Sequence, residues 1–231
     1  MTSQLGSLLS LVLGSLLPLG IGAAISPWPT TVCIMFLSTR RPLAKALAYS
    51  IGYSSVLVAI GILALIIFGG GGYERGDRSS AVGGAIDTVL GGLLLIVALT
   101  LWVKRPDPSA QPPRWMSAFD SIGMGGAFFL GLFMMATNFT SLPLYIAGLK
   151  DIVSANLSLA SNIFALALFI SLILVELSVP IIVYARSPRR GGERLGVARQ
   201  WLEKNNRLIT IFILVFYGIL LLAKGTSSPQ G

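Results

Sequence analysis

The segment Ser26-Pro27-Trp28-Pro29-Thr30 lies inside a long apolar stretch, where a helix in a membrane would run unbroken. A second segment, Thr137-Asn138-Phe139-Thr140-Ser141, interrupts another apolar stretch about half a chain length later. Each segment puts prolines, hydroxyls or amides at a depth where backbone polar groups must normally bond within the protein. Breaks at corresponding positions in the two halves of a chain indicate a transport site.

The composition is that of an integral membrane protein. Hydrophobic residues make up 54% of the 231 residues, charged residues make up 11%, and the mean hydropathy is +0.81. Soluble globular chains carry about twice that share of charge. The net charge of +8 does not indicate a nucleic-acid partner, because the basic residues lie in loops between apolar spans. They instead indicate membrane topology and contacts with anionic lipid headgroups.

We expect neither an enzyme nor a metal or cofactor site. The chain has no histidine, which is the commonest metal ligand, and its single cysteine is Cys33. One cysteine excludes a disulfide framework and a two-cysteine redox relay. The sequence also offers no paired carboxylates and no nucleophile placed beside a base.

Six transmembrane helices are expected, in two halves. Their approximate bounds are Leu8 to Leu37, Ala44 to Phe68, Gly83 to Val103, Ile122 to Leu149, Ser161 to Tyr184 and Leu208 to Ala223. Residues 105–120 form a proline-rich cytoplasmic linker between a first three-helix repeat, 1–104, and a second one, 121–231. The second half contains a long basic loop, 185–207, with the character of an amphipathic segment that binds headgroups.

The basic residues predict the orientation of the chain. Most of the 17 Lys and Arg residues fall in the loops after the first, third and fifth spans. The exceptions are Arg75, Arg78, Lys150 and Lys224. The positive-inside rule therefore places those three loops in the cytoplasm and both termini outside. Because each half has three spans, related halves must lie in opposite orientations, which predicts two inverted repeats.

The two breaks carry most of the predicted substrate-binding residues. Pro27 and Pro29 lack N–H groups, so nearby backbone acceptors lose their helical partners, and neighbouring hydroxyls can bond the freed carbonyls. The alternatives are a proline kink that only shapes packing and, at Asn138, a polar contact between helices. The predicted set is Ser26, Pro27, Trp28, Pro29, Thr30, Thr137, Asn138, Phe139 and Thr140.

Glu176 is the only acid well inside a span, and we predict that it couples transport to protons. A carboxylate inside a membrane is costly and is by default a functional candidate. Pro180 has no N–H group to donate to the backbone carbonyl of Glu176. A proton or cation can therefore be held between this carbonyl and the Glu176 carboxyl group. The alternative is a structural carboxyl group bonded to a neighbouring Ser or Tyr. Asp87 lies nearer the outer boundary, where we expect it to be solvated or to act as a charge at the start of a helix.

Two tyrosines in the second span are further candidates. Tyr49 and Tyr53 lie four residues apart and so share one face of a helix. We predict that they line the transport path, although aromatic residues at such positions more commonly serve packing.

The chain resembles a known family at Ala24-Ile25-Ser26-Pro27-Trp28-Pro29, followed by Arg41-Pro42, Tyr49 and Gly52-Tyr53. It is similar to the GAP (peptidoglycolipid-addressing) family of actinobacteria, also called Sap or sulfolipid-addressing proteins, within the LysE superfamily of small exporters. The resemblance implies a bacterial plasma (inner) membrane, LysE-like inverted repeats and export of glycolipids or related envelope lipids. The Asn-Pro pairs of the superfamily correspond here to Ser26-Pro27 and Thr137-Asn138. Both depart from Asn-Pro, which disfavours an amino-acid exporter.

These observations favour a transporter that moves an amphipathic envelope lipid or glycolipid toward the cell surface. One alternative is a small-solute exporter, for amino acids or cations, of the same superfamily. Another is a non-transporting membrane scaffold for lipid synthesis or export. The expected partners are membrane lipids and the lipid substrate, with a homodimer or a synthesis or export partner left open.

Overall fold

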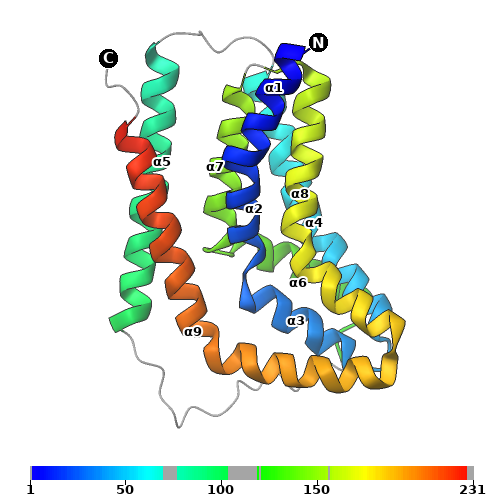
Figure 1. Cartoon of the computed structure of the whole chain (residues 1–231). Helices are drawn as coiled ribbons and strands as arrows, with labels where there is room; N and C mark the ends of the chain where they lie inside the picture. Colours follow the sequence, from blue (N-terminus) through cyan, green and yellow to red (C-terminus); the bar gives the residue numbers. More distant parts are fainter. Residues whose placement is uncertain (1, 70–76, 104–118, 120, 156, 228–231) are drawn as a thin grey trace.

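The structure, a computed structural model, describes residues 2–69, 77–103, 119, 121–155 and 157–227 (Figure 1). Every element in these ranges is a helix, which confirms the all-α prediction. Five of the described helices are long and apolar enough to cross a membrane, or six if one bent pair counts as a single span. The predicted linker 105–120 falls almost wholly outside the described residues.

The first apolar stretch is broken where the sequence predicts. Helices α1 (Thr2–Leu11) and α2 (Leu17–Ala24) flank a π-helical turn, η1 (Val12–Leu16), and α3 (Pro27–Leu37) follows. Ser26 is extended, with φ −111° and ψ 107°, because a following proline disfavours helical backbone. Pro27 then occupies the first turn of α3, where its missing N–H costs nothing. Gln4–Ala24 is about 30 Å long, which is enough to span a bilayer without α3, so the break accounts for the excess length of the apolar stretch.

The second break lies between α6 (Met124–Ala136) and α7 (Ser141–Ser154), which are bent by 68°. The side-chain oxygen of Asn138 accepts the backbone N–H groups of Thr140 and Ser141, both at 3.1 Å. These N–H groups start α7 and have no partner within the helix, so Asn138 caps the second half of the span.

The remaining long helices are α4 (Pro42–Gly69), α5 (Asp77–Val103), α8 (Leu159–Arg186) and α9 (Pro188–Ser227). The prediction that residues 185–207 form a loop is wrong. Only Ser187 interrupts the helical backbone in this segment. Pro188 supplies a favourable first helical position, and the amphipathic segment continues directly into the last span. In Figure 1, α9 runs across the lower end of the molecule in contact with α3 and α8, then turns up beside α5.

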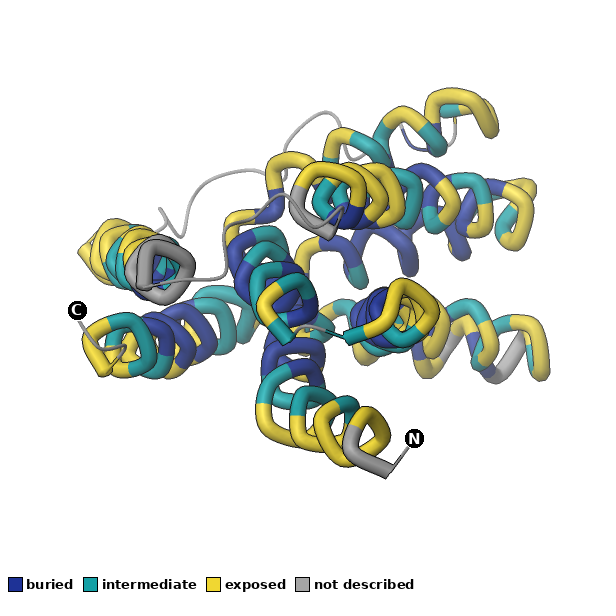
Figure 2. The backbone as a smooth tube through the Cα atoms, turned by 90° about the horizontal axis from the view of Figure 1, so that it is seen from above, coloured by how far each residue is buried: buried dark blue, intermediate teal, exposed yellow. Residues whose placement is uncertain are grey.

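Two helix pairs approach at backbone distance. In the α4–α6 pair, a Cβ atom on Gly131 would lie 2.1 Å from the carbonyl oxygen of Tyr49. In the α5–α9 pair, a Cβ atom on Gly91 would lie 2.8 Å from the carbonyl oxygen of Gly218. Small residues allow such approaches in membranes, where dispersion contacts replace the hydrophobic effect between helices. Seen from above, the α5–α9 pair stands to one side of the other helices (Figure 2).

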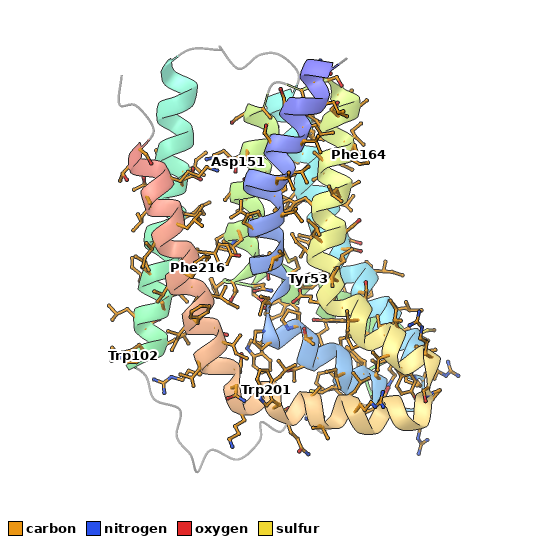
Figure 3. All side chains as sticks on the ribbon, viewed as in Figure 1. Tyr53, Trp102, Asp151, Phe164, Trp201 and Phe216 are labelled. Atoms are coloured by element: carbon orange, nitrogen blue, oxygen red, sulfur yellow. The ribbon has the colours of Figure 1, made fainter. Side chains whose placement is uncertain are left out.

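The helices run so that both ends of the chain lie at one end of the molecule (Figure 1). We call this the terminal end, and we call the opposite end, where α3 meets α4, the basic end. The basic end carries Arg40, Arg41 and the first half of α9. The exposed side chains of Trp102 and Trp201 also lie toward this end (Figure 3). Tryptophans of this kind mark the boundary between hydrocarbon and headgroups.

The close approach of α4 and α6 makes Gly131 sensitive to the smallest substitution. Gly131→Ala places a methyl group against the Tyr49 carbonyl and must push the helices apart, at a cost of roughly 1–3 kcal/mol as for other overpacked sites. Gly125→Ala is the matched control, because nothing lies within 4 Å of a Cβ atom there. We expect thermal unfolding in detergent to show a lower Tm for Gly131→Ala and an unchanged or slightly raised Tm for Gly125→Ala. Equal Tm values would contradict this packing.

Candidate functional site

The two helix breaks meet near the centre of the molecule. The Asn138 side-chain nitrogen donates to Ser26 Oγ at 3.3 Å, and Ser26 Oγ lies 3.5 Å from Asn138 Oδ1. Both side chains are buried, with exposed fractions of 4% for Ser26 and 9% for Asn138. The structure thus brings together two predicted residues that lie 112 positions apart in the sequence.

Asn138 uses its full hydrogen-bonding capacity to hold this junction. The two N–H groups of its Nδ2 are shared among Ser26 Oγ, Ser141 Oγ at 2.9 Å and Tyr53 Oη at 3.2 Å. Ser141 Oγ in turn donates to the carbonyl oxygen of Ala23 at 2.7 Å, near the end of α2. One amide side chain therefore links both breaks to α4, and Ser141 completes the link to α2. Ser141 was quoted within the second polar segment but was not among the predicted site residues.

Glu176 lies behind this junction. Tyr53 Oη donates to Glu176 Oε1 at 2.7 Å, so a continuous chain of hydrogen bonds runs from Glu176 through Tyr53 and Asn138 to Ser26. Tyr53 lies in the middle of the bundle, at the level of the breaks (Figure 3). Glu176 is 6% exposed, and its second oxygen, Oε2, is buried without a hydrogen-bond partner in the described part of the chain. The contact with Tyr53 is the one expected of a structural carboxyl group, whereas the unused Oε2 leaves a place for a proton.

Hydroxyl groups satisfy the backbone at the first break. Thr30 Oγ1 donates to the carbonyl oxygen of Ser26 at 3.2 Å, and Thr31 Oγ1 donates to that of Pro27 at 2.7 Å. Tyr49 Oη donates to the carbonyl oxygen of Pro29 at 3.4 Å. These bonds, from two predicted residues and from Thr31, hold the start of α3 in place.

A cavity of about 820 Å³ opens beside the junction. This volume lies within the range of sites for drug-sized molecules. Its walls come from α3, α5, α6, α9 and the second break, and they are mostly apolar. Of the predicted residues, those that line it are Ser26, Pro27, Trp28, Pro29, Thr137, Asn138, Phe139 and Thr140.

Four predicted residues do not line this cavity: Thr30, Tyr49, Tyr53 and Glu176. Tyr49 and Tyr53 therefore do not line this cavity, and a role for them in lining a transport path stays a prediction. Both are fully buried, because the face of α4 that they share packs against α3 and α8. They support the cavity wall from behind.

Arg207 supplies a positive charge at the cavity and was not predicted as a site residue. Its Nε donates to the carbonyl oxygen of Leu101 at 2.9 Å, and its Nη2 donates to that of Trp102 at 2.7 Å, so it caps the end of α5. A guanidinium group has five N–H donors, and these two bonds leave others for a ligand. Among the described residues, no carboxylate lies within 4.0 Å of it. The available signal was its position as the last basic residue before the final apolar span.

Asn206 and Thr210 line the cavity beside Arg207. Thr210 Oγ1 donates to Asn206 Oδ1 at 3.2 Å, one turn along α9. The cavity thus has two polar regions, one at the helix breaks and one around Arg207, joined by apolar walls.

Both expectations for Asp87 are wrong, because it is buried and lies ten positions after the first residue of α5. Its side chain is 1% exposed and forms an ion pair with Lys150 of α7. The residue's distance along its own helix suggested solvent, but a lysine from another helix covers it.

These features define a multi-pass helical membrane protein with a cavity where two broken helices meet. A family model described as Sap, sulfolipid-1-addressing protein, matches residues 16–227, and the chain belongs to this family. The resemblance to the Sap family found in the sequence is thereby confirmed. No curated protein and no solved structure matches the chain.

The junction predicts a large effect at Asn138 and a small one at its neighbour Thr137. Asn138→Ala removes the cap of α7 and leaves buried donors and acceptors unpaired, at a cost of roughly 1–3 kcal/mol. Thr137→Ala loses only a bond to the carbonyl oxygen of Phe133 within its own helix turn. We expect a lower Tm in detergent for Asn138→Ala and little change for Thr137→Ala. A similar Tm for the two variants would argue against Asn138 as the link between the breaks.

Proposed function

We propose that this protein carries an amphipathic envelope lipid through the cavity at the two helix breaks, toward the cell surface. The observation that carries the proposal is the composition of the cavity walls, which are apolar except at two separated polar regions. An acyl chain suits the apolar walls, and a polar headgroup suits Ser26 and Asn138 or the region around Arg207. The description of the family as sulfolipid-addressing supports a lipid rather than a small solute.

Arg207 favours a headgroup that carries an anion. Its charge lies in a mostly apolar cavity, and a planar guanidinium group suits sulfate, phosphate or carboxylate oxygens, which accept paired N–H bonds. Asn206 adds a side-chain amide beside it. A sulfated lipid, as in the family description, has this chemistry.

The contacts between helices support the proposal of two inverted three-helix repeats. In the first half, α3 contacts α4 of its own half and α8 and α9 of the other half. In the second half, α7 contacts α8 of its own half and α2, α4 and α5 of the other half. Counting spans within each half, the contacts with the second and third spans correspond to the same positions, as expected for a two-fold axis in the membrane plane. The contact between α2 and α7 has no counterpart of similar extent between α3 and α6. We propose on this basis a LysE-like exporter with the basic end in the cytoplasm and both termini outside.

Glu176 is proposed to couple transport to proton binding. An ionised carboxylate in a membrane interior is costly, so binding of a proton at Oε2 removes a penalty. Loss of the charge weakens the hydrogen bond from Tyr53, because bonds to a charged acceptor are stronger than bonds to a neutral one. Tyr53 is also bonded to Asn138, so the change reaches the junction of the two breaks.

The first experiment compares surface-extractable and cell-bound lipids in strains with and without this gene. We expect one lipid class to accumulate in the cell-bound pool and to fall in the surface pool when the gene is deleted. If both pools are unchanged, lipid export is wrong, and sensitivity of the deletion strain to amino acids and metal ions then tests the small-solute exporter. The deletion strain is also complemented with a variant that carries Ser26→Ala and Asn138→Ala. If deletion changes the lipid pools and this variant restores both pools fully, the scaffold is favoured.

Arg207→Gln tests the headgroup contact in the same assay. A hydrogen bond to a charged group is worth roughly 1.5–3 kcal/mol, so we expect the export rate of an anionic lipid to fall about tenfold or more. Arg199→Gln is the matched control on the same helix, because Arg199 pairs with Glu203 at the surface and does not line the cavity. Equal export by the two variants at equal expression would contradict an anion contact at Arg207.

Glu176→Gln tests proton coupling, since glutamine keeps the shape but does not ionise. We expect lower surface lipid and loss of the response of export to a protonophore. Tyr53→Phe, which removes the hydroxyl between Glu176 and Asn138, is expected to weaken the same response. The control is Glu203→Gln at the surface ion pair. Full export with an intact protonophore response in Glu176→Gln would leave Glu176 only a structural role.

A further inference from the structure

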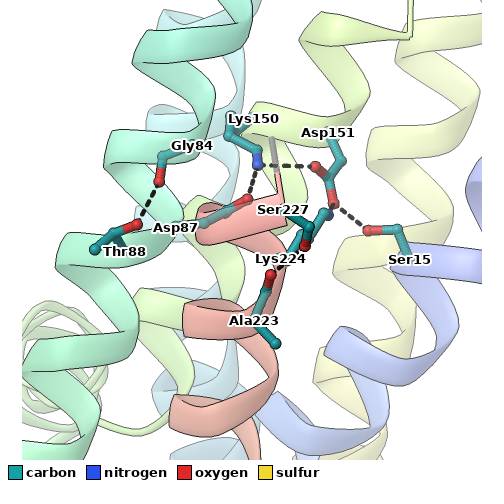
Figure 4. A network of polar contacts seen from close by, with 9 residues as sticks. All are labelled: Ser15, Gly84, Asp87, Thr88, Lys150, Asp151, Ala223, Lys224 and Ser227. Carbon is teal, nitrogen blue, oxygen red and sulfur yellow. Dashed lines mark hydrogen bonds and ion pairs between the residues drawn. The ribbon is translucent and has the colours of Figure 1, made fainter. Parts of the chain in front are cut away.

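A cluster of charged residues joins the α5–α9 pair to the rest of the protein (Figure 4). Lys150 pairs with Asp87 of α5 and lies 3.3 Å from Oδ1 of Asp151. Lys224 of α9 lies 2.5 Å from Oδ2 of Asp151, and Ser15 of η1 donates a hydrogen bond to that same oxygen. We call these five residues the charge cluster.

The charge cluster and the cavity lie toward opposite ends of the same two helices. Asp87 precedes the cavity residue Val97 by ten positions on α5, and Lys224 follows the cavity residue Leu214 by ten positions on α9. At about 1.5 Å per residue, each separation is roughly 15 Å. The cluster therefore lies between the cavity and the terminal end of the molecule.

The charges of the cluster balance one another and are largely shielded from solvent. The exposed side-chain fractions are 1% for Asp87, 11% for Asp151, 13% for Lys150 and 39% for Lys224. Two carboxylates and two ammonium groups sum to zero charge. Pulling one member of such a set away leaves a buried charge without its partner, which is strongly unfavourable unless water enters. Without water, the paired charges therefore hold the α5–α9 pair against α7 and η1. Once the charges are separated, water must solvate them, which favours an arrangement in which these helices lie apart.

Two features fit an arrangement that also opens. Asp87 Oδ1 is buried and has no hydrogen-bond partner in the described ranges, so the closed cluster is not fully satisfied. Ser15 comes from the π-helical turn η1, a local irregularity of the kind often found where helices must adjust.

The hydrogen bonds of the α5–α9 pair have different partners at the terminal end and at the basic end of the molecule. On the terminal side of the cavity, Tyr217 Oη of α9 donates to the carbonyl oxygen of Pro18 at 2.6 Å, so Tyr217 joins the charge cluster in tying the pair to other helices. At the basic end, the hydrogen bonds of Arg207 stay within the pair, because they join α9 to α5. The close packing of Gly91 against Gly218 lets these two helices move as one unit.

We infer that the charge cluster is a gate that closes the lipid cavity from the terminal end of the molecule. This inference rests on the proposed function, in which the cavity must be reached from both sides of the membrane. Separation of Lys150 from Asp87, and of Lys224 from Asp151, frees the α5–α9 pair from α7 and η1 at that end. The cavity then becomes accessible to water from the side that carries the termini.

The test is thiol labelling of full-length protein in oriented membranes. Cys33 is the single cysteine of the chain, so Cys33→Ser gives a cysteine-free background. Thr137→Cys then places a reporter in the cavity wall. A membrane-impermeant maleimide is added from either side, and Arg199→Cys on the same background identifies the basic end. With the cluster intact, we expect labelling of Thr137→Cys from the basic end only.

Asp87→Asn and Lys150→Gln are the variants that break the cluster. In each we expect labelling from the terminal end to rise at least about fivefold over the parent. The exchanged double variant Asp87→Lys/Lys150→Asp restores opposite charges, and we expect it to return labelling most of the way to the parent value. Lys224→Gln changes the most exposed of the four charges and tests the same effect where a buried substitution prevents folding.

Unchanged labelling from the terminal end in correctly folded Asp87→Asn, Lys150→Gln and Lys224→Gln would overturn the gate. So would a failure of the exchanged variant to reverse the increase. Since labelling needs no lipid, the two proposals fail separately. A labelling response together with unchanged lipid pools in the deletion strain would overturn only the lipid function, and unchanged labelling together with impaired lipid export would overturn only the gate.

Discussion

The hydrogen bonds of Asn138 are the constraint on which the arrangement of the molecule depends. Two broken helices leave free backbone groups near the centre of the protein, and in a membrane these groups must find partners within the protein. Asn138 accepts the first N–H groups of α7 and donates toward Ser26 at the first break and Tyr53 of α4. Ser141 extends the junction to the carbonyl of Ala23. The breaks thus stabilise each other, and neither half helix is a separate defect.

Close packing elsewhere decides where the cavity lies. Glycines bring α4 against α6 and α5 against α9 at backbone distance, and these contacts leave no room for a ligand. The remaining space lies where the walls of α5 and α9 face those of α3 and α6, beside the junction. The cavity is therefore a consequence of two tightly joined pairs that meet around polar breaks.

The sequence predicts what is local and misses what depends on distant partners. Pro27 and Asn138 stand out because each is unusual within an apolar run, and the structure has a break at both places. Arg207 and Asp87 belong to the second kind. Arg207 reaches the end of α5 only because α9 packs along that helix, and Asp87 is buried only because α7 brings Lys150 to it. The segment 185–207 was misread for another reason, since a helix rich in basic and polar residues has the composition of a loop.

The position of Glu176 limits how it can influence a bound lipid. It does not line the cavity, and Tyr53 and Asn138 stand between its carboxyl group and the cavity wall. Direct contact between a substrate and this carboxyl group is therefore not part of the arrangement described. Its carboxyl group reaches the junction through the Tyr53 hydroxyl and Asn138, and also through the backbone of Ser26. The Asn138 side chain fixes the start of α7 and the position of Ser26. Under the proposed coupling, a proton at Glu176 therefore acts on the geometry of the breaks, and the proposed lipid substrate responds to the shape of the cavity wall.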